Sequence, residues 1–151
     1  MSGRTLKLLA EDAQDLSVLS ACLQDALLRV EDMAFVEAER RFVAVFSRFR
    51  WEAAVVKGID GPRSQVRSGL RFEGVRAVRS RGIDREKRSE LLELLALTLE
   101  ENTGDDEKGV SIQLLFAGGG EIRLFTDTLS CALEDLGESW TIHVSPKHDL
   151  T

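Results

Sequence analysis

The sequence of 151 residues contains no tyrosine and only two tryptophans, two cysteines and two histidines. Sites that bind sugars or single-stranded nucleic acid by stacking depend on exposed aromatic rings, so this composition disfavours both. No apolar run approaches the roughly 18 residues that a membrane-spanning helix needs. Residues 1–14 also lack the apolar run of a signal peptide. These absences predict a cytoplasmic protein without a membrane segment.

The scarcity of cysteine and histidine also disfavours metal and nucleophile chemistry. Cys22 and Cys131 lie far apart and within apolar patterns, so we expect two reduced core thiols. His143 and His148 lie in a polar C-terminal stretch and form a poor zinc set with a single cysteine. Adjacent carboxylate pairs point to opposite faces of a strand rather than into one cleft. We predict no metal site, no cofactor and no catalytic residue, and a non-enzymatic protein is favoured over an enzyme.

Length and composition fit one domain over residues 1–151, with a frayed tail from about residue 145. Apolar residues make up 43% of the chain and charged residues 30%, which is typical of a globular protein. Apolar positions three and four apart predict one long N-terminal helix from about Ala13 to Leu28. Asp12 is expected to cap this helix, and Asp15 falls in its first turn.

Most of the remaining chain alternates between apolar and polar residues, which predicts strands. A short strand is expected near residues 5–9, a hairpin over 32–52 with its turn at 37–40, and a loop over 52–63. The pattern over 65–78 breaks at Glu73 and Gly74, where we expect a bulge. Residues 90–100 and 128–136 fit a helix or a strand, and for the first of these we favour a strand from about Glu93. A polar turn is expected over 103–109.

The stretch "LLFAGGGEIRLF", from Leu114 to Phe125, raises the possibility of a phosphate-binding loop. Such a loop continues into lysine, serine or threonine and then a helix, whereas here Glu121 and a strand pattern follow. Glycine also permits the positive φ angles of tight turns. We predict a hairpin turn.

The fold class that follows is α+β, with one long N-terminal helix. Sequential hairpins predict an antiparallel, strongly bent sheet or partly open barrel of seven to eight strands. A pleckstrin-homology-like roll is one shape that fits, by an analogy that implies no function.

Basic residues gather in one segment of an otherwise acidic chain. Residues 63–88 hold nine basic and three acidic residues, a net charge of +6 in a chain whose total is −6. Such asymmetry suits a docking surface for an anionic partner. The candidate partner-binding residues are Arg76, Arg79, Arg81 and Arg85, joined by Arg48, Arg50 and Trp51 from the preceding hairpin. The alternative is internal pairing of these arginines with acidic residues on a solvated sheet face.

Four segments resemble an uncharacterised alphaproteobacterial family, domain-of-unknown-function family 2948. They are "LKLLAEDAQDLSVLSACLQDALLRVEDM", "ERRFVAVFSRFRWE", "VRAVRSRGID" and "LLFAGGGEIRLFTDTLSCALEDLGESW". The resemblance extends from about Leu6 to Trp140. It implies a bacterial cytoplasmic protein of one domain and carries no activity, cofactor or catalytic residue to transfer.

Three functions stay open at this point. The first is a binding or adaptor module whose arginine-rich surface meets an anionic partner, expected to be a protein; nucleic acid is disfavoured by the acidic overall charge. The second is an enzyme or small-ligand-binding protein with an arginine-lined pocket inside the sheet. The third is a structural homodimer formed through an open strand edge.

Overall fold

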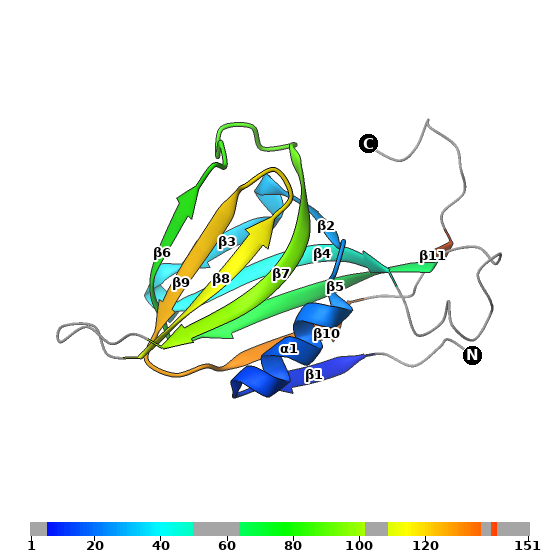
Figure 1. The fold of residues 1–151 in the computed structure, drawn as a ribbon. Helices are drawn as coiled ribbons and strands as arrows, with labels where there is room; N and C mark the ends of the chain where they lie inside the picture. Colours follow the sequence, from blue (N-terminus) through cyan, green and yellow to red (C-terminus); the bar gives the residue numbers. More distant parts are fainter. Residues whose placement is uncertain (1–5, 50–63, 102–108, 137–139, 142–151) are drawn as a thin grey trace.

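A computed structural model of the chain describes residues 6–49, 64–101, 109–136 and 140–141 (Figure 1). The elements, in chain order, are β1 (Lys7–Ala10), α1 (Ala13–Cys22), β2 (Leu27–Arg29), the 3-10 helix η1 (Val30–Asp32), β3 (Met33–Val36), the 3-10 helix η2 (Glu37–Glu39), β4 (Arg41–Phe49), β5 (Ser64–Glu73), β6 (Val75–Arg81), β7 (Leu91–Glu101), β8 (Val110–Phe116), β9 (Glu121–Thr126), β10 (Cys131–Asp135) and β11 (Trp140–Thr141).

The strands form one antiparallel, strongly bent sheet with the order β1-β10-β5-β4-β2-β7-β8-β9-β6 (Figure 1). Strand β3 pairs with β4 beside β2, and β11 pairs with β5. The sheet is not closed, since β1 and β6 stand at its two ends. We call β1, β10, β5, β4, β3 and β11 the first half of the sheet, and β7, β8, β9 and β6 the second half. Strand β2 links them by pairing with β4 and with β7.

The predicted α+β class, antiparallel sheet and single N-terminal helix are confirmed, but the strand number was wrong. The described residues form ten strands of at least three residues, with the two-residue β11 in addition. The short strands account for the difference. In particular, β2 overlaps the end of the range predicted to be helix.

Helix α1 ends at Cys22, six residues before the predicted end. Its start is as expected, because the Asp12 carboxylate accepts a hydrogen bond from the backbone N–H of Asp15 at 2.8 Å. Beyond the helix, Asp25 adopts a left-handed conformation with φ 65°, and its N–H donates to the carbonyl of Leu94 in β7. Pairing with a neighbouring strand therefore replaces the helical hydrogen bonds, and the apolar residues 26, 28 and 30 alternate as in a strand.

Both segments that fitted either a helix or a strand are strands, namely β7 and β10. The triple glycine joins β8 to β9 as a hairpin turn, as predicted. Gly118 and Gly119 have φ angles of 89° and 98°, which a side chain would disfavour. Gly74 (φ 70°) turns the chain from β5 into β6, and the register of β6 against β9 shifts between Val75 and Ala77. The irregularity expected at Glu73 and Gly74 is thus a turn followed by a bulge.

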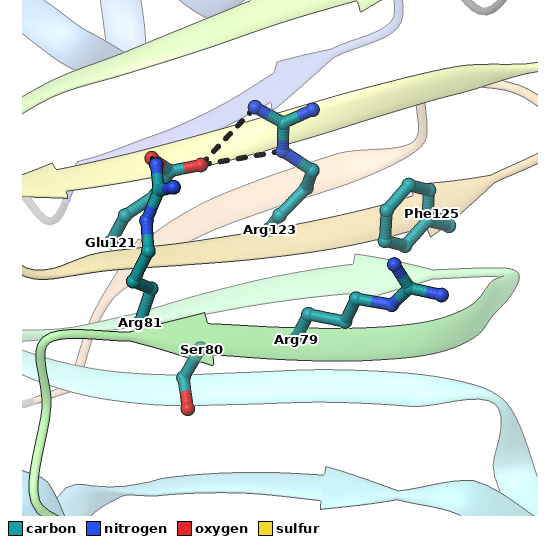
Figure 2. Close-up of a pocket in the computed structure, with 6 residues that line it drawn as sticks. All are labelled: Arg79, Ser80, Arg81, Glu121, Arg123 and Phe125. Atoms are coloured by element: carbon teal, nitrogen blue, oxygen red, sulfur yellow. Dashed lines mark hydrogen bonds and ion pairs between the residues drawn. The ribbon is translucent and has the colours of Figure 1, made fainter.

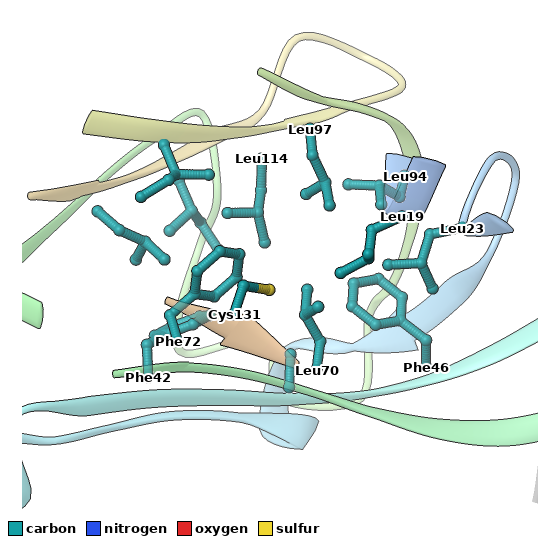
Figure 3. Close-up of a cluster of buried hydrophobic side chains, with 14 of the residues drawn as sticks. Leu19, Leu23, Phe42, Phe46, Leu70, Phe72, Leu94, Leu97, Leu114 and Cys131 are labelled. Carbon is teal, nitrogen blue, oxygen red and sulfur yellow. The ribbon is translucent and has the colours of Figure 1, made fainter. Parts of the chain in front are cut away.

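Apolar side chains from both halves and from α1 fill the space enclosed by the sheet (Figure 3). Phe46 and Phe72 come from the first half, Leu94 and Leu114 from the second, and Leu19 from α1. Helix α1 packs against β1 and β7 and so joins the two halves. Burial of these side chains is the main stabilising term of such a fold.

Cys22 and Cys131 are thiols rather than disulfide-bonded, and Cys131 is buried. Burial raises the pKa of the Cys131 thiol to about 12, although the positive charge of Arg71 acts in the opposite direction. No helix in the described part of the chain is long and apolar enough to cross a membrane. The predicted loop over 52–63, both histidines and the tail from residue 145 lie outside the described residues, as does nearly all of the polar turn at 103–109.

Candidate functional site

Antiparallel pairing of β6 with β9 gathers charged side chains on the outer face of the second half. Arg79 lies opposite Arg123, and Arg81 lies opposite Glu121. Residues two apart in a strand share a face, so these side chains project together. They surround a hollow of about 420 Å³ lined by Arg79, Ser80, Arg81, Glu121, Arg123 and Phe125 (Figure 2). We call this the β6–β9 hollow.

Glu121 holds two of the three arginines in the β6–β9 hollow. Its carboxylate accepts from Arg81 Nη2 at 3.2 Å and from Arg123 Nη2 at 3.2 Å. Glu100 of β7 adds a longer contact of 3.9 Å to Arg123 Nη1. The side chain of Arg81 is still 82% exposed, so its charge faces solvent despite this pair. The hollow therefore keeps a positive charge next to its one lining carboxylate.

Arg79 differs from its neighbours because no ion pair links it to a carboxylate among the described residues. Its guanidinium lies over the ring of Phe125, 5.5 Å from the ring centroid (Figure 2). The ring face attracts a cation but leaves its charge uncompensated. Like charges directly opposite each other in a sheet are destabilising, and Arg79 is paired in register with Arg123. An anion placed between these two side chains would remove that repulsion.

The other candidate residues of β6 and the following loop lie elsewhere. Arg76 forms an ion pair with Asp127 at 3.1 Å, close to the bulge of β6. Arg85 belongs to the exposed β6–β7 loop and lines a separate cavity, described below. Arg50 and Trp51 lie outside the described residues. The structure thus brings Arg79 and Arg81 together and leaves Arg76 and Arg85 away from them.

The prediction that Arg48 belongs to a partner-binding surface was wrong. Its side chain is completely buried. Arg48 Nη2 and Nε donate to the two carboxylate oxygens of Asp135 at 3.0 Å and 3.1 Å. Ser68 Oγ and the backbone N–H of Leu6 donate to the same carboxylate at 2.7 Å and 2.9 Å. The arginine follows Phe42, Ala44 and Phe46 on the inward face of β4, and only a carboxylate partner makes that position tolerable.

Burial alone would raise the pKa of Asp135. Hydrogen bonds from Arg48, from Ser68 and from the amide of Leu6, together with the charge of Arg48, outweigh burial and place this pKa below its usual range. Asp135 is therefore a carboxylate at neutral pH and links β4, β5, β10 and the residue directly before β1 at one point. This buried cluster connects strands of the first half of the sheet.

The family model described as "Protein of unknown function (DUF2948)" matches residues 6–148. The chain belongs to this family. The resemblance expected from the sequence is therefore confirmed, and it brings no described activity with it. A search of curated proteins and a search of solved structures each found no match.

Within this DUF2948 domain, sequence analysis missed Arg123 and Glu121, which complete the β6–β9 hollow. The signal was present, because Glu121, Arg123 and Phe125 alternate with three buried residues in β9. A second missed feature is the approach of Asp25 to Glu93, where the hydrogen bond that the protonated Glu93 carboxyl donates to Asp25 raises the pKa of Glu93. No group of three potential metal ligands occurs among the described residues.

Proposed function

We propose that this domain is a non-enzymatic binding module whose β6–β9 hollow docks an acidic segment of a partner protein. The observation that carries the proposal is Arg79, which has no carboxylate partner among the described residues and faces Arg123 across the strand pair. A cytoplasmic location and an alphaproteobacterial origin belong to the same proposal.

The chemistry of the β6–β9 hollow suits a carboxylate-bearing chain. Guanidinium groups bind carboxylates through two parallel hydrogen bonds. Arg79 offers such a group without a carboxylate partner among the described residues, opposite Arg123, which pairs with Glu121. Phe125 supplies an apolar surface beneath Arg79 for the aliphatic part of an acidic side chain. A carboxylate here would compensate Arg79 and reduce the repulsion between the two arginines.

An internal ligand pocket is less well supported. The space enclosed by the sheet holds closely spaced leucine, isoleucine, valine and phenylalanine side chains (Figure 3). The arginines of the β6–β9 hollow lie on the outer face instead, which favours docking of a surface segment over capture of a small substrate in the interior.

The test measures binding of a fluorescein-labelled peptide of alternating glutamate and valine to the purified protein by anisotropy. The double variant Arg79→Glu/Arg81→Glu should bind it about tenfold more weakly or worse, a loss of about 1.4 kcal/mol. Added salt should also weaken binding to the wild-type protein, because the contact is electrostatic and exposed.

The matched control is Lys7→Glu/Arg67→Glu, which makes the same change of net charge on exposed residues of β1 and β5. This control should bind the peptide as the wild-type protein does. Equal weakening in both double variants would show a general charge effect and overturn the proposal. Displacement of the labelled peptide by inorganic pyrophosphate, with no displacement by the unlabelled peptide, would favour the small-ligand alternative.

A further inference from the structure

Strand β6 ends the sheet and has one open edge. It pairs with β9 alone among the described strands, and β3 pairs with β4 alone. Alternate residues of such a strand direct their N–H and C=O groups outward, where another strand can pair with them. The second half of the sheet therefore offers a backbone template beside the β6–β9 hollow.

A small cavity lies between the open edges of β6 and β3. It has a volume of about 170 Å³, and its lining includes Met33 and Phe35 from β3 with Val78 and Ser80 from β6. Backbone hydrogen bonds hold the chain segments around it. The N–H of Val75, at the start of β6, donates to the carbonyl of Arg40 at 2.8 Å, and the N–H of Glu31 in η1 donates to the carbonyl of Arg88 in the β6–β7 loop at 2.9 Å.

The two faces of β6 present different chemistry at this edge. Arg79 and Arg81 project over the β6–β9 hollow, and Ser80 points the opposite way (Figure 2). Val78 shares the face of Ser80 and packs against the apolar core. A strand added beside β6 places its own alternate side chains on these same two faces.

We infer that the acidic segment binds as an added strand along the open edge of β6. Its carboxylates face Arg79 and Arg81, and the alternate apolar side chains enter the cavity between β6 and β3. The ligand class is thus an extended peptide in which acidic and small apolar residues alternate. This inference rests on the proposed function and adds the backbone conformation and sequence pattern of the partner.

A second copy of the chain is a poorer occupant of this edge. The segment from Val75 to Arg81 contains three arginines and no acidic residue. Antiparallel pairing of two copies through β6 would set arginines against arginines, which is destabilising in a sheet. Charge complementarity therefore favours an acidic strand over self-association.

The decisive experiment compares peptides of one composition. The alternating glutamate–valine peptide should bind about tenfold more tightly than a peptide with three glutamates followed by three valines, since only alternation serves both faces. N-methylation of every second peptide amide removes its donors. Two peptides are methylated at alternate amides in the two possible phases. The peptide whose methylated amides face β6 should bind about tenfold more weakly, and the peptide methylated at the other amides should keep more of its affinity.

Variants on β3 test the apolar part of the site. Ala34 is exposed and lines the cavity, so Ala34→Trp should fill the cavity and weaken binding of the alternating peptide. Ala38→Trp is the matched control, because Ala38 is exposed in η2 and is not among the lining residues. It should leave binding unchanged.

The outcomes separate the two proposals. Equal binding of alternating and block peptides, with equal effects of both methylation patterns, would overturn strand addition; the proposed function would stand if Arg79→Glu/Arg81→Glu still abolished that binding. Unchanged binding in that double variant, or no binding of either peptide, would overturn both. A stable dimer that Ala34→Trp dissociates would identify a second copy as the occupant and overturn the acidic-peptide inference.

Discussion

Arg48 in the first half of the sheet and Arg79 in the second half carry the same side chain in opposite settings. Arg48 is completely buried and donates to both oxygens of Asp135. Arg79 is exposed, lies over Phe125 and faces another arginine. Both belong to antiparallel strands, and the pairing of those strands with distant parts of the chain gives the two arginines opposite surroundings.

The presence or absence of a neighbouring carboxylate distinguishes the two arginines. A buried guanidinium without a partner is very unfavourable, so Arg48 depends on Asp135 for its position. An exposed guanidinium stays hydrated and needs no partner, so Arg79 remains available to a ligand. The first arginine contributes to stability and the second to the proposed binding.

The largest expected effect comes from removing the buried arginine. Arg48→Met leaves Asp135 buried without its partner and should lower the free energy of unfolding by about 3–5 kcal/mol. Urea unfolding followed by circular dichroism measures this loss. Replacing both partners, as in Arg48→Met/Asp135→Leu, should recover part of the stability because no unpaired charge remains. If Arg48→Met were as stable as the wild-type protein, the structural role of the Arg48–Asp135 pair would be contradicted.

An intermediate effect is expected from acid. The pKa of Asp135 is lower in the folded than in the unfolded chain, so its contribution is complete above about pH 4 and is lost as the pH falls through the folded-state pKa. Between about pH 4 and the folded-state pKa, one such group adds at most about 1.4 kcal/mol per pH unit to the fall in the free energy of unfolding. The isosteric Asp135→Asn variant should lack this contribution in urea unfolding between pH 5 and pH 2. Identical pH slopes for the two proteins would argue against a carboxylate with a lowered pKa.

The smallest effect is expected for the exposed arginine. Arg79→Glu loses the contact with Phe125 but sets a carboxylate opposite Arg123, and these changes act in opposite directions. The free energy of unfolding should therefore change by less than about 0.5 kcal/mol. The same urea titration measures it beside Arg48→Met. A loss comparable to that of Arg48→Met would mean that Arg79 is structural and would remove the basis of the comparison.

The inward position of Arg48 could be predicted from the sequence, but its partner could not. The inward position of Arg48 had a local signal, since it continues the alternation of Phe42, Ala44 and Phe46. Its partner did not, because Asp135 is 87 positions away and only the sheet order brings the two together. The end of α1 was missed because residues 23, 26 and 27 fit a helical period while residues 26, 28 and 30 fit a strand.

The sequence by itself determined the α+β class, the antiparallel hairpins, the cap of α1 and the turn at the triple glycine. These features depend on alternation, turn residues and capping within a few positions of each other. Only the tertiary structure decided that Arg48 is buried with Asp135, that Arg79 faces Arg123, and that β6 has an open edge. Those facts depend on which distant strands pair and in which register, and no local pattern specifies that choice.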